Sequence, residues 1–293
     1  MHRSFLNLAL LAAGSFISAS TSYARAQWMD NLESDFSVTS SYRRFYQSDV
    51  NADSGEIAVA ESKVEFQEEL KIYQLPLTFG AVVKHVDIND TIVQELPTAL
   101  IGRMFETGAK FPAPFMDHEH FFMGVDIRPS LYTDEWGETW GGGAFRIPFR
   151  TYLIYKGSDD FILVGGVYVR PEFDTEVLPV IGFIYRPNER LSFNFASDDP
   201  HVAYKLTDQA TLMMEFGYTL DEYEVKRGTQ DGVVLRYSGL TTGAGIKYDF
   251  NDCLQAAVSA GGAFARRLEY DDGAGKVVPE NAVYSSVRLT ARF

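Results

Sequence analysis

The sequence predicts an all-β protein: a single antiparallel transmembrane up-and-down β-barrel of about 12 strands that follows a signal peptide. Three observations predict this fold. Apolar and polar residues alternate with a period of two over most of the chain, as expected for strands whose two faces meet different surroundings. Beyond the N-terminal segment, no apolar run approaches the length of a membrane helix. The last segment also alternates and ends on an aromatic residue, Phe293.

The composition of this 293-residue chain excludes several classes of protein. It has 26 Lys and Arg against 40 Asp and Glu, a formal net charge of −14. Nucleic-acid phosphates bind basic surfaces, so no nucleic-acid partner is expected. A hydrophobic share of 46% is too high for a disordered chain. The single cysteine, Cys253, excludes an internal disulfide framework and a zinc site built from cysteines.

Residues 1–26 have the features of a secretory signal peptide. Arg3 gives a positive start, residues 5–17 are largely apolar, and Ala24-Arg25-Ala26 is an A-x-A cleavage signal. The apolar stretch is shorter than the roughly 20 residues of a membrane helix. Cleavage leaves residues 27–293, which is 293 − 26 = 267 residues, as the barrel domain. Loss of Arg3 and Arg25 changes the formal charge from −14 to −16.

Period-two alternation assigns the strands in order. Helical spacing of i, i+3 and i+4 does not fit these segments, whereas the period of a strand does. The clearest apolar series are Val64, Phe66, Leu70 and Ile72; Phe121, Met123, Val125, Ile127 and Leu131; Phe145, Ile147, Phe149, Leu153 and Tyr155; Leu212, Met214, Phe216, Tyr218 and Leu220; and Leu254, Ala256, Val258, Ala260 and Phe264. The predicted strands are residues 34–47, 59–73, 76–88, 120–133, 141–155, 160–170, 178–187, 190–205, 210–226, 232–248, 253–269 and 280–293.

One predicted strand, 190–205, leaves two interpretations open. Ser197-Asp198-Asp199-Pro200 interrupts it, so it is compatible with two short strands. Two strands here would make thirteen in all, and bacterial single-chain barrels have even counts. We therefore predict one strand with a bulge or kink at Pro200.

An even strand count places both chain ends on the periplasmic side and fixes the side of each connection. The predicted periplasmic links are Gln74-Leu75, 134–140, 171–177, 206–209 and 249–252. The predicted outer loops are 48–58, 89–119, 156–159, 188–189, 227–231 and 270–279. Loop 89–119 is apolar and approximates an amphipathic helix broken by Pro97 and Gly102. We expect it to constrict the barrel, cap its mouth or pack against the rim.

Two resemblances point to a bacterial outer membrane. The terminal strand, with Val287, Leu289 and Phe293 on one face, resembles the C-terminal signature that the barrel-assembly machinery reads in outer-membrane barrels. The second half resembles an uncharacterised family of Gram-negative outer-membrane barrels, a domain of unknown function, over about residues 110–293. The runs that carry this likeness are LPVIGFIYRP at 178–187, DPHVAY at 199–204, MEFGY at 214–218 and GAGIKY at 243–248. The resemblance implies outer-membrane lipid and lipopolysaccharide as surroundings, and it implies no activity.

The faces opposite the apolar ones are expected to line the lumen. They carry ten cations, Arg43, Lys63, Lys71, Lys84, Arg128, Arg146, Arg150, Arg267, Arg288 and Arg292, against four acids, Glu65, Glu69, Asp126 and Glu215. One interpretation is a lumen filled by ion pairs, and the other is a cation-lined path that favours anionic solutes. The predicted lining residues are Lys63, Glu65, Asp126, Arg128, Arg146, Arg150, Arg267 and Arg288.

These patterns leave three hypotheses about function. The first is a narrow passive channel or structural component of the outer membrane. The second is a barrel enzyme acting on lipid or lipopolysaccharide, and the third is a soluble secreted β-sandwich that binds a partner. Barrel lipases and deacylases carry His and Ser two residues apart, and no His here has a Ser at that spacing.

No cofactor, metal or catalytic residue is expected. His118-Glu119-His120, beside Asp117, has no clear third ligand for a metal. Gly141-Gly142-Gly143 precedes no helix, so it is not a phosphate loop.

Overall fold

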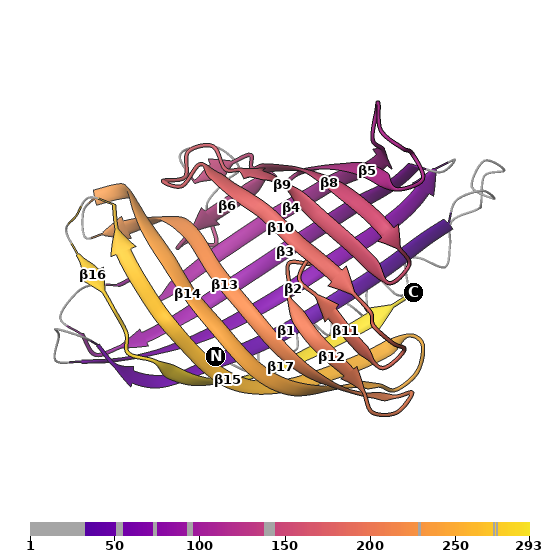
Figure 1. The fold of residues 1–293 in the computed structure, drawn as a ribbon. Helices are drawn as coiled ribbons and strands as arrows, with labels where there is room; N and C mark the ends of the chain where they lie inside the picture. Colours follow the sequence, from indigo (N-terminus) through magenta and orange to yellow (C-terminus); the bar gives the residue numbers. More distant parts are fainter. Residues whose placement is uncertain are drawn as a thin grey trace, which may run out of the picture.

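A computed structural model describes residues 33–50, 55–72, 75–92, 96–137, 144–227, 230–271, 273 and 275–293 (Figure 1). The strands are β1 (Glu33–Asp49), β2 (Glu56–Ile72), β3 (Leu75–Asp90), β4 (Ala99–Pro112), β5 (Phe121–Ile127), β6 (Ser130–Thr133), β7 (Phe145–Arg146), β8 (Phe149–Ser158), β9 (Phe161–Val169), β10 (Val177–Tyr185), β11 (Leu191–Asn194), β12 (His201–Lys205), β13 (Ala210–Arg227), β14 (Gln230–Asp249), β15 (Leu254–Tyr270), β16 (Lys276–Val277) and β17 (Ala282–Arg292). Within these ranges, no helix is long and apolar enough to cross a membrane. The predicted signal peptide, 1–26, and the domain start at residue 27 lie outside the described residues.

The sheet closes on itself, so the predicted antiparallel barrel is confirmed. β1 pairs antiparallel with β2 on one side and with β17 on the other, where Ser37 lies opposite Arg292. The described residues give a wall of 14 strands: β1, β2, β3, β4, β5, β8, β9, β10, β11, β12, β13, β14, β15 and β17. β6, β7 and β16 are short continuations of this wall. A closed sheet is not a β-sandwich, so that alternative fold is wrong.

The predicted count of about 12 was wrong because two strands were missed. β4 lies within the predicted loop 89–119 and pairs with both β3 and β5. Its neighbours Leu100 and Ile101 are both fully buried, so the strand shows no clean alternation. Residues 190–205 form two strands, β11 and β12. The sequence was compatible with this interpretation, but we predicted one strand with a bulge or kink at Pro200. Because both strands were missed together, the total stayed even and parity gave no warning.

Because of the two missed strands, the connections that lie between them along the chain were assigned to the wrong end of the barrel. We call the barrel end at Glu33 and Phe293 the proximal end, and the opposite one the distal end. The predicted periplasmic links 134–140 and 171–177 join strands at the distal end. The predicted outer loops 156–159 and 188–189 fall at the proximal end. After β12 the prediction and the structure agree again, because the second missed strand restores the parity.

The barrel narrows towards the distal end. There β6 pairs with β4 and forms a parallel bridge to β13, with Thr133 opposite Glu224. β8 to β12 end before this level, so the described wall passes from β4 through β6 directly to β13. Nine strand lines remain in this ring: β1, β2, β3, β4, β6, β13, β14, β15 and the β16–β17 line. A barrel of about eight strands is just wide enough for its own side chains to fill.

A hydrophobic core fills this narrow ring. Tyr223, Leu235 and Leu268 come from one wall and Ile57 and Val86 from the other, and all five are fully buried. The cluster consists of Phe45, Val50, Ile57, Val59, Val86, Ile88, Leu100, Tyr223, Val225, Val233, Leu235, Tyr237, Ala263, Leu268, Tyr270, Val277 and Tyr284. Burial of a Leu or Val side chain contributes about 1.5–3 kcal/mol. We call this ring and its core the distal cap.

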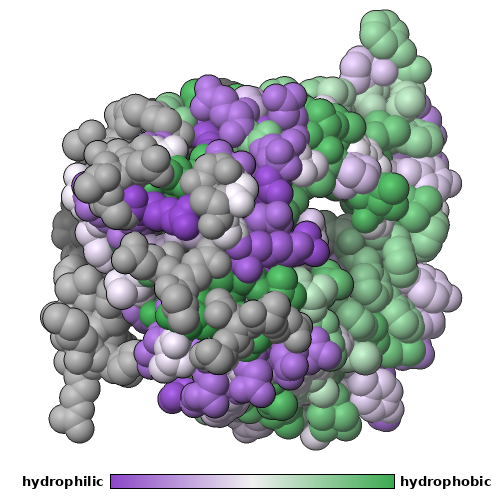
Figure 2. All heavy atoms as spheres, turned by 90° about the vertical axis from the view of Figure 1, so that its left-hand side faces the viewer, coloured by the Kyte–Doolittle hydropathy of each residue, from purple (hydrophilic) through white to green (hydrophobic). Residues whose placement is uncertain are grey.

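The outer surface changes polarity where the cap begins. Nearer the proximal end, the outward side chains of β13 and β14 are apolar and exposed, as at Met214 and Leu240. Beyond this level the outward positions of the same strands hold Glu222, Glu224 and Arg236. Figure 2, which looks onto the distal end, shows hydrophilic residues gathered there and hydrophobic residues on the right-hand side. We call the exposed apolar outer residues below the cap the apolar belt. They include Phe79, Phe105, Leu163, Ile181, Phe183, Leu212, Met214, Tyr218, Leu240, Ile246, Val258, Val283, Val287 and Leu289.

Candidate interior chamber

A cavity of about 460 Å³ lies inside the barrel, next to the cap. We call it the chamber. Its basic lining residues are Arg43, Lys63, Lys84, Arg128, Arg170 and Arg288, and its acidic ones are Glu61, Glu65, Asp198, Asp199 and Asp221. Six cations face five carboxylates. The chamber is therefore close to neutral, whereas the sequence predicts a strongly cationic lumen.

Ion pairs connect opposite walls of the chamber. Lys84 of β3 lies 2.9 Å from Asp221 of β13 and 3.8 Å from Glu61 of β2. Arg43 of β1 lies 3.8 Å from the same Glu61 carboxylate. Tyr237 of the cap donates a hydrogen bond of 3.1 Å to Glu61. Charges in a confined interior need partners, and this network joins the chamber to the hydrophobic core above it.

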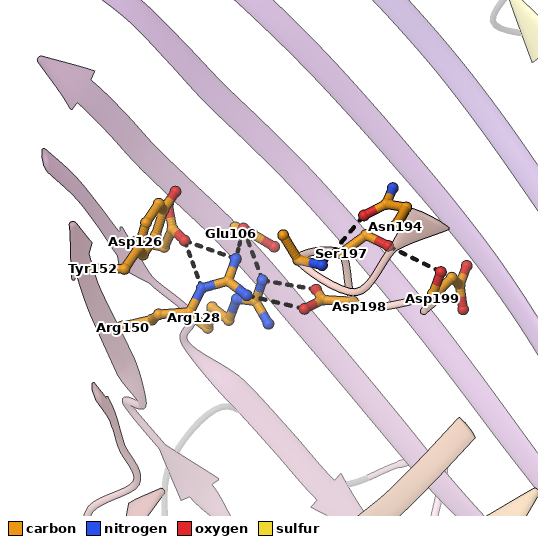
Figure 3. A network of polar contacts seen from close by, with 10 residues as sticks. Glu106, Asp126, Arg128, Arg150, Tyr152, Asn194, Ser197, Asp198 and Asp199 are labelled. Carbon is orange, nitrogen blue, oxygen red and sulfur yellow. Dashed lines mark hydrogen bonds and ion pairs between the residues drawn. The ribbon is translucent and has the colours of Figure 1, made fainter. Parts of the chain in front are cut away.

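The connection between β11 and β12, residues 195–200, projects into the lumen and is held there by arginines (Figure 3). Asp198 accepts a hydrogen bond of 3.0 Å from Arg128 and one of 2.9 Å from Arg150. Arg128 also contacts Glu106 at 3.0 Å, and Arg150 contacts Asp126 at 2.8 Å. We call residues 195–200 the inner loop. Two arginines sharing one carboxylate fix its position, because charge-assisted hydrogen bonds are stronger than neutral ones.

Gly182 explains how the chain turns inward at this loop. Gly182 lies on the inner face of β10, directly beneath the start of the inner loop. A Cβ atom there would lie 2.3 Å from the carbonyl oxygen of Phe195 and 2.7 Å from the Cα atom of Ala196. Only glycine permits this approach of two backbones. A larger residue would push the inner loop out of its place.

Two further cavities continue from the chamber towards the proximal end. One of about 210 Å³ shares Arg43, Asp199 and Arg288 with the chamber. The next, of about 470 Å³, shares His201 and Lys247 with it. We call these two cavities the vestibule. Its basic residues are Arg43, Arg186, Arg190, Lys205, Lys247, Arg288 and Arg292, and its acidic ones are Asp160, Glu189, Asp199 and Glu215. The vestibule is basic, and the inner loop separates it from the chamber.

The predicted lining residues divide into three groups. Lys63, Glu65, Arg128 and Arg288 line the chamber. Asp126 and Arg150 belong to the network that holds the inner loop. Arg146 is buried against the edge of β13, 3.7 Å from the carboxylate of Glu222.

Arg267 is the exception, and it corrects the predicted set. Ala265 has a positive φ of 49°, and the register of β14 with β15 shifts at this point. Such a bulge moves the following side chains to opposite faces. Arg267 therefore lies on the outer surface, 3.7 Å from Glu269. Arg266 takes the inward place and is buried.

Sequence reasoning missed several residues of the chamber. Glu61 continues the parity of Lys63 and Glu65, so the alternation already contained the signal for it. Asp221 lies on the same inward face of β13 as Tyr223. It was missed because the prediction followed the apolar series on the outward face. Asp198 lies in a connection, and no periodicity reports on where a connection folds.

Local hydrogen bonds hold the two described histidines that lie beside candidate catalytic or metal-ligating groups. Ser197 and His201 both hydrogen-bond the carbonyl oxygen of Asp199 rather than each other. In the proximal loop 113–120, His120 Nδ1 lies 2.6 Å from Asp117. The Glu119 amide and then the His120 side chain lower the pKa of Asp117. No cluster of three metal-ligating side chains occurs in the described ranges.

Comparison with known proteins gives weak structural similarity alone. No family model matches the chain, and no curated protein matches it. An outer membrane channel from Pseudomonas putida F1 is 10% identical, covers 92% of this chain and 100% of its own, and has a TM-score of 0.46. The toluene transporter TodX of Pseudomonas putida is 10% identical over 88% and 89% of the two chains, with a TM-score of 0.41. The translocator domain of the autotransporter NalP from Neisseria meningitidis is 10% identical over 98% and 97%, with a TM-score of 0.36. All three TM-scores lie below 0.5.

Proposed function

We propose that this protein is an integral outer-membrane barrel that acts as a passive channel for small organic solutes. The observation that carries the proposal is the pairing of an apolar belt outside with three polar cavities in series inside. A closed barrel leaves no unsatisfied sheet edge in lipid. The apolar belt matches the lipid-facing band of membrane barrels, and the polar interior matches their lumen.

The orientation follows from the two ends of the barrel. Glu33, Phe293 and the four-residue connections 206–209 and 250–253 lie at the proximal end. The connection 271–281, which contains β16, is longer and lies at the distal end, while the proximal loop 113–120 is the exception to this division. Bacterial barrels have short periplasmic turns and longer extracellular loops. In this proposal the vestibule opens to the periplasm, and the cap stands outside the membrane. The basic vestibule would then favour anionic solutes.

A sealed structural barrel is the second candidate, and the cap favours it. The hydrophobic core fills the distal ring, so we expect low ionic conductance along the barrel axis. A channel must therefore admit its solute by another route. An enzyme is the less supported hypothesis, because the nearby Ser197 and His201 hydrogen-bond the carbonyl oxygen of Asp199 rather than each other.

The test begins with membrane fractionation and heat-modifiable gel mobility of the full chain. Outer-membrane recovery and a compact band that shifts on boiling are expected. Uptake of benzenesulfonate, a permanent anion, is then measured in proteoliposomes. Wild-type uptake above that of empty vesicles, and faster uptake by Asp198→Asn, which frees the inner loop from Arg128 and Arg150, are expected. Uptake equal to that of empty vesicles in both proteins would favour the sealed barrel.

We also propose that the last strand is read by the barrel-assembly machinery. Support comes from the closing seam, where Phe36 and Phe293 exchange backbone hydrogen bonds of 3.3 and 2.8 Å. Their rings lie 5.9 Å apart. We expect Phe293→Ala to lower the amount of folded protein in the outer membrane several-fold. Val283→Ala, an outward change on the same strand, is the control, and equal yields would contradict the proposal.

A further inference from the structure

We propose that the chamber opens sideways into the membrane between β10 and β13, and that this opening admits a small carboxylate with an apolar body. The inference rests on the proposed function and specifies its route and solute class. We call the opening the lateral window. It is bounded by Leu178 of β10 and residues 216–220 of β13, all of which line the chamber.

The window exists because β13 lacks a strand partner over part of its length. Pairing with β12 ends at Glu215, and the amide of Phe216 donates to the carbonyl of Pro200. The next described strand contact on this side is the bridge from Glu224 to β6. In Figure 1 the short β11–β12 hairpin lies beside only the proximal part of β13. Residues 217–223 of β13 therefore present a free backbone edge among the described strands.

Arginine side chains cap this edge in place of a strand. Arg170 donates a hydrogen bond of 2.9 Å to the carbonyl of Leu220. Arg146 donates one of 3.4 Å to the carbonyl of Glu222. An unpaired edge inside a bilayer is costly unless its polar groups are satisfied. Side-chain capping satisfies these two carbonyls, and the chamber extends into the space between β10 and β13.

The chamber reaches through this space. Its lining includes Thr219 and Asp221, which point inward from β13, and also Tyr218 and Leu220, which point outward. A cavity lined from both faces of one strand extends past the edge of that strand. Figure 2 shows the surface hollowed on the side where the hydrophobic residues gather.

The chemistry of the rim indicates what passes through it. Outside, Ile181 is 83% exposed and Tyr218 is 62% exposed, and both belong to the apolar belt. Inside, the guanidinium of Arg170 is buried and lies 4.0 Å from the ring centre of Phe173. No carboxylate of a described residue lies within 4.0 Å of Arg170. An apolar body would partition from lipid past the rim, and Arg170 would pair with a carboxylate head.

The size of the chamber fits such a molecule. Its volume of about 460 Å³ lies within the 300–1,000 Å³ typical of small-molecule sites. The other five chamber cations already have carboxylate partners, and they are Arg43, Lys63, Lys84, Arg128 and Arg288. Arg170 is thus the cation of the window best placed to receive an incoming anion.

The experiment measures binding to the full chain in lipid nanodiscs. The probes are 4-iodobenzoate and 12-iodododecanoate, whose iodine quenches intrinsic fluorescence. 4-Iodobenzyl alcohol is the uncharged match. We expect Arg170→Gln to weaken binding of the carboxylate at least tenfold and to change binding of the alcohol less than twofold. Arg170→Lys should stay within about threefold of wild type. The two carboxylates distinguish an aromatic solute from an acyl chain.

The route is tested by narrowing the window. Leu178→Trp should slow carboxylate association at least tenfold. Val287→Trp, on the outward face of β17 and away from the window, should leave it unchanged. Unchanged association in Leu178→Trp would overturn lateral access, and equal carboxylate binding in Arg170→Gln would overturn the role of Arg170. Failure of the proposed function gives a different result, namely no heat-modifiable protein in the outer membrane or no uptake of benzenesulfonate.

Discussion

The distal cap and the apolar belt are built from the same strands but have opposite polarity. In the cap, β14 points Leu235 and Tyr237 inward and Arg236 outward. In the belt, the same strand points Leu240 outward and Lys247 into the vestibule. The alternation has one period throughout, and in the proposed membrane barrel what changes is the medium outside. A cap with an apolar interior is stable in water, whereas a belt with an apolar exterior is stable in lipid.

This comparison teaches how to find the membrane boundary in a barrel strand. Period-two alternation separates two faces but does not say which one meets the solvent. In the proposed membrane barrel, the inversion on β13, from exposed Met214 and Tyr218 to the outward but less exposed Glu224, marks the level where lipid gives way to water. The taper from 14 to nine strand lines occurs at the same level. A narrow ring can fill its own interior, and so it needs no lipid around it.

The largest expected difference in stability comes from truncating one leucine in the cap and one in the belt. Leu235→Ala in the cap should lower the free energy of unfolding by about 2–5 kcal/mol, because it leaves a cavity in a packed core. Leu240→Ala in the belt should lower it by about 1 kcal/mol, because lipid fills the vacated space. Denaturant unfolding of the refolded proteins in lipid measures both. Equal losses would mean that the cap is not a packed core.

A charge placed on the outer face tests the same boundary from outside. Ala244→Lys, at the middle of the outward belt positions 240–248 of β14, should lower the free energy of unfolding by about 2–4 kcal/mol. Val234→Lys, outward on the same strand but in the cap, should change it by no more than about 0.5 kcal/mol. Val234 lies opposite Glu224, so the new charge gains a partner. Similar costs at the two positions would move the boundary from where we place it.

A smaller effect is expected from the ion pairs of the chamber. Lys84→Met should cost about 1–3 kcal/mol in the free energy of unfolding, because Glu61 and Asp221 both lose a partner in a confined site. Lys63→Met is the matched control. The pair that Lys63 forms with Glu65 is more exposed, so its loss should cost about 1 kcal/mol or less. A larger loss in Lys63→Met than in Lys84→Met would contradict the burial we assign to the chamber.

Most of the fold was predictable from the sequence, and the failures have physical causes. Strands whose outer face is apolar and exposed along their length, such as β17, alternate cleanly. β4 does not, because Leu100 and Ile101 are both buried, one in the cap and the other on the opposite face of the strand. The short strands β11 and β12 were predicted as one strand, because an even strand count was preferred to a break at Pro200.

The chamber was less predictable than the barrel. The alternation along an uninterrupted strand indicates which face a residue lies on. It therefore indicates the inward positions of Lys63, Glu65, Arg128 and Arg288. It does not indicate the inner loop, because the place of this loop depends on Gly182 and on arginines from β8 and its neighbours. Arg267 shows the limit of the method, since the bulge at Ala265 exchanges its face with that of Arg266. The sequence alone gives no sign of the free edge on β13, which depends on where other strands end.

The most direct test of the account is a cysteine scan along the outward face of β14. The exposed Cys253 is first replaced by Ser, and single cysteines are then placed at positions 234, 236, 238, 240, 242, 244 and 246. Labelling by a membrane-impermeant maleimide is compared in proteoliposomes with quenching of an attached fluorophore by nitroxide lipids. We expect positions 234–238 to be labelled and positions 240–246 to be protected and quenched by lipid. Uniform labelling from 234 to 246 would contradict the division into cap and belt, and the membrane channel with it.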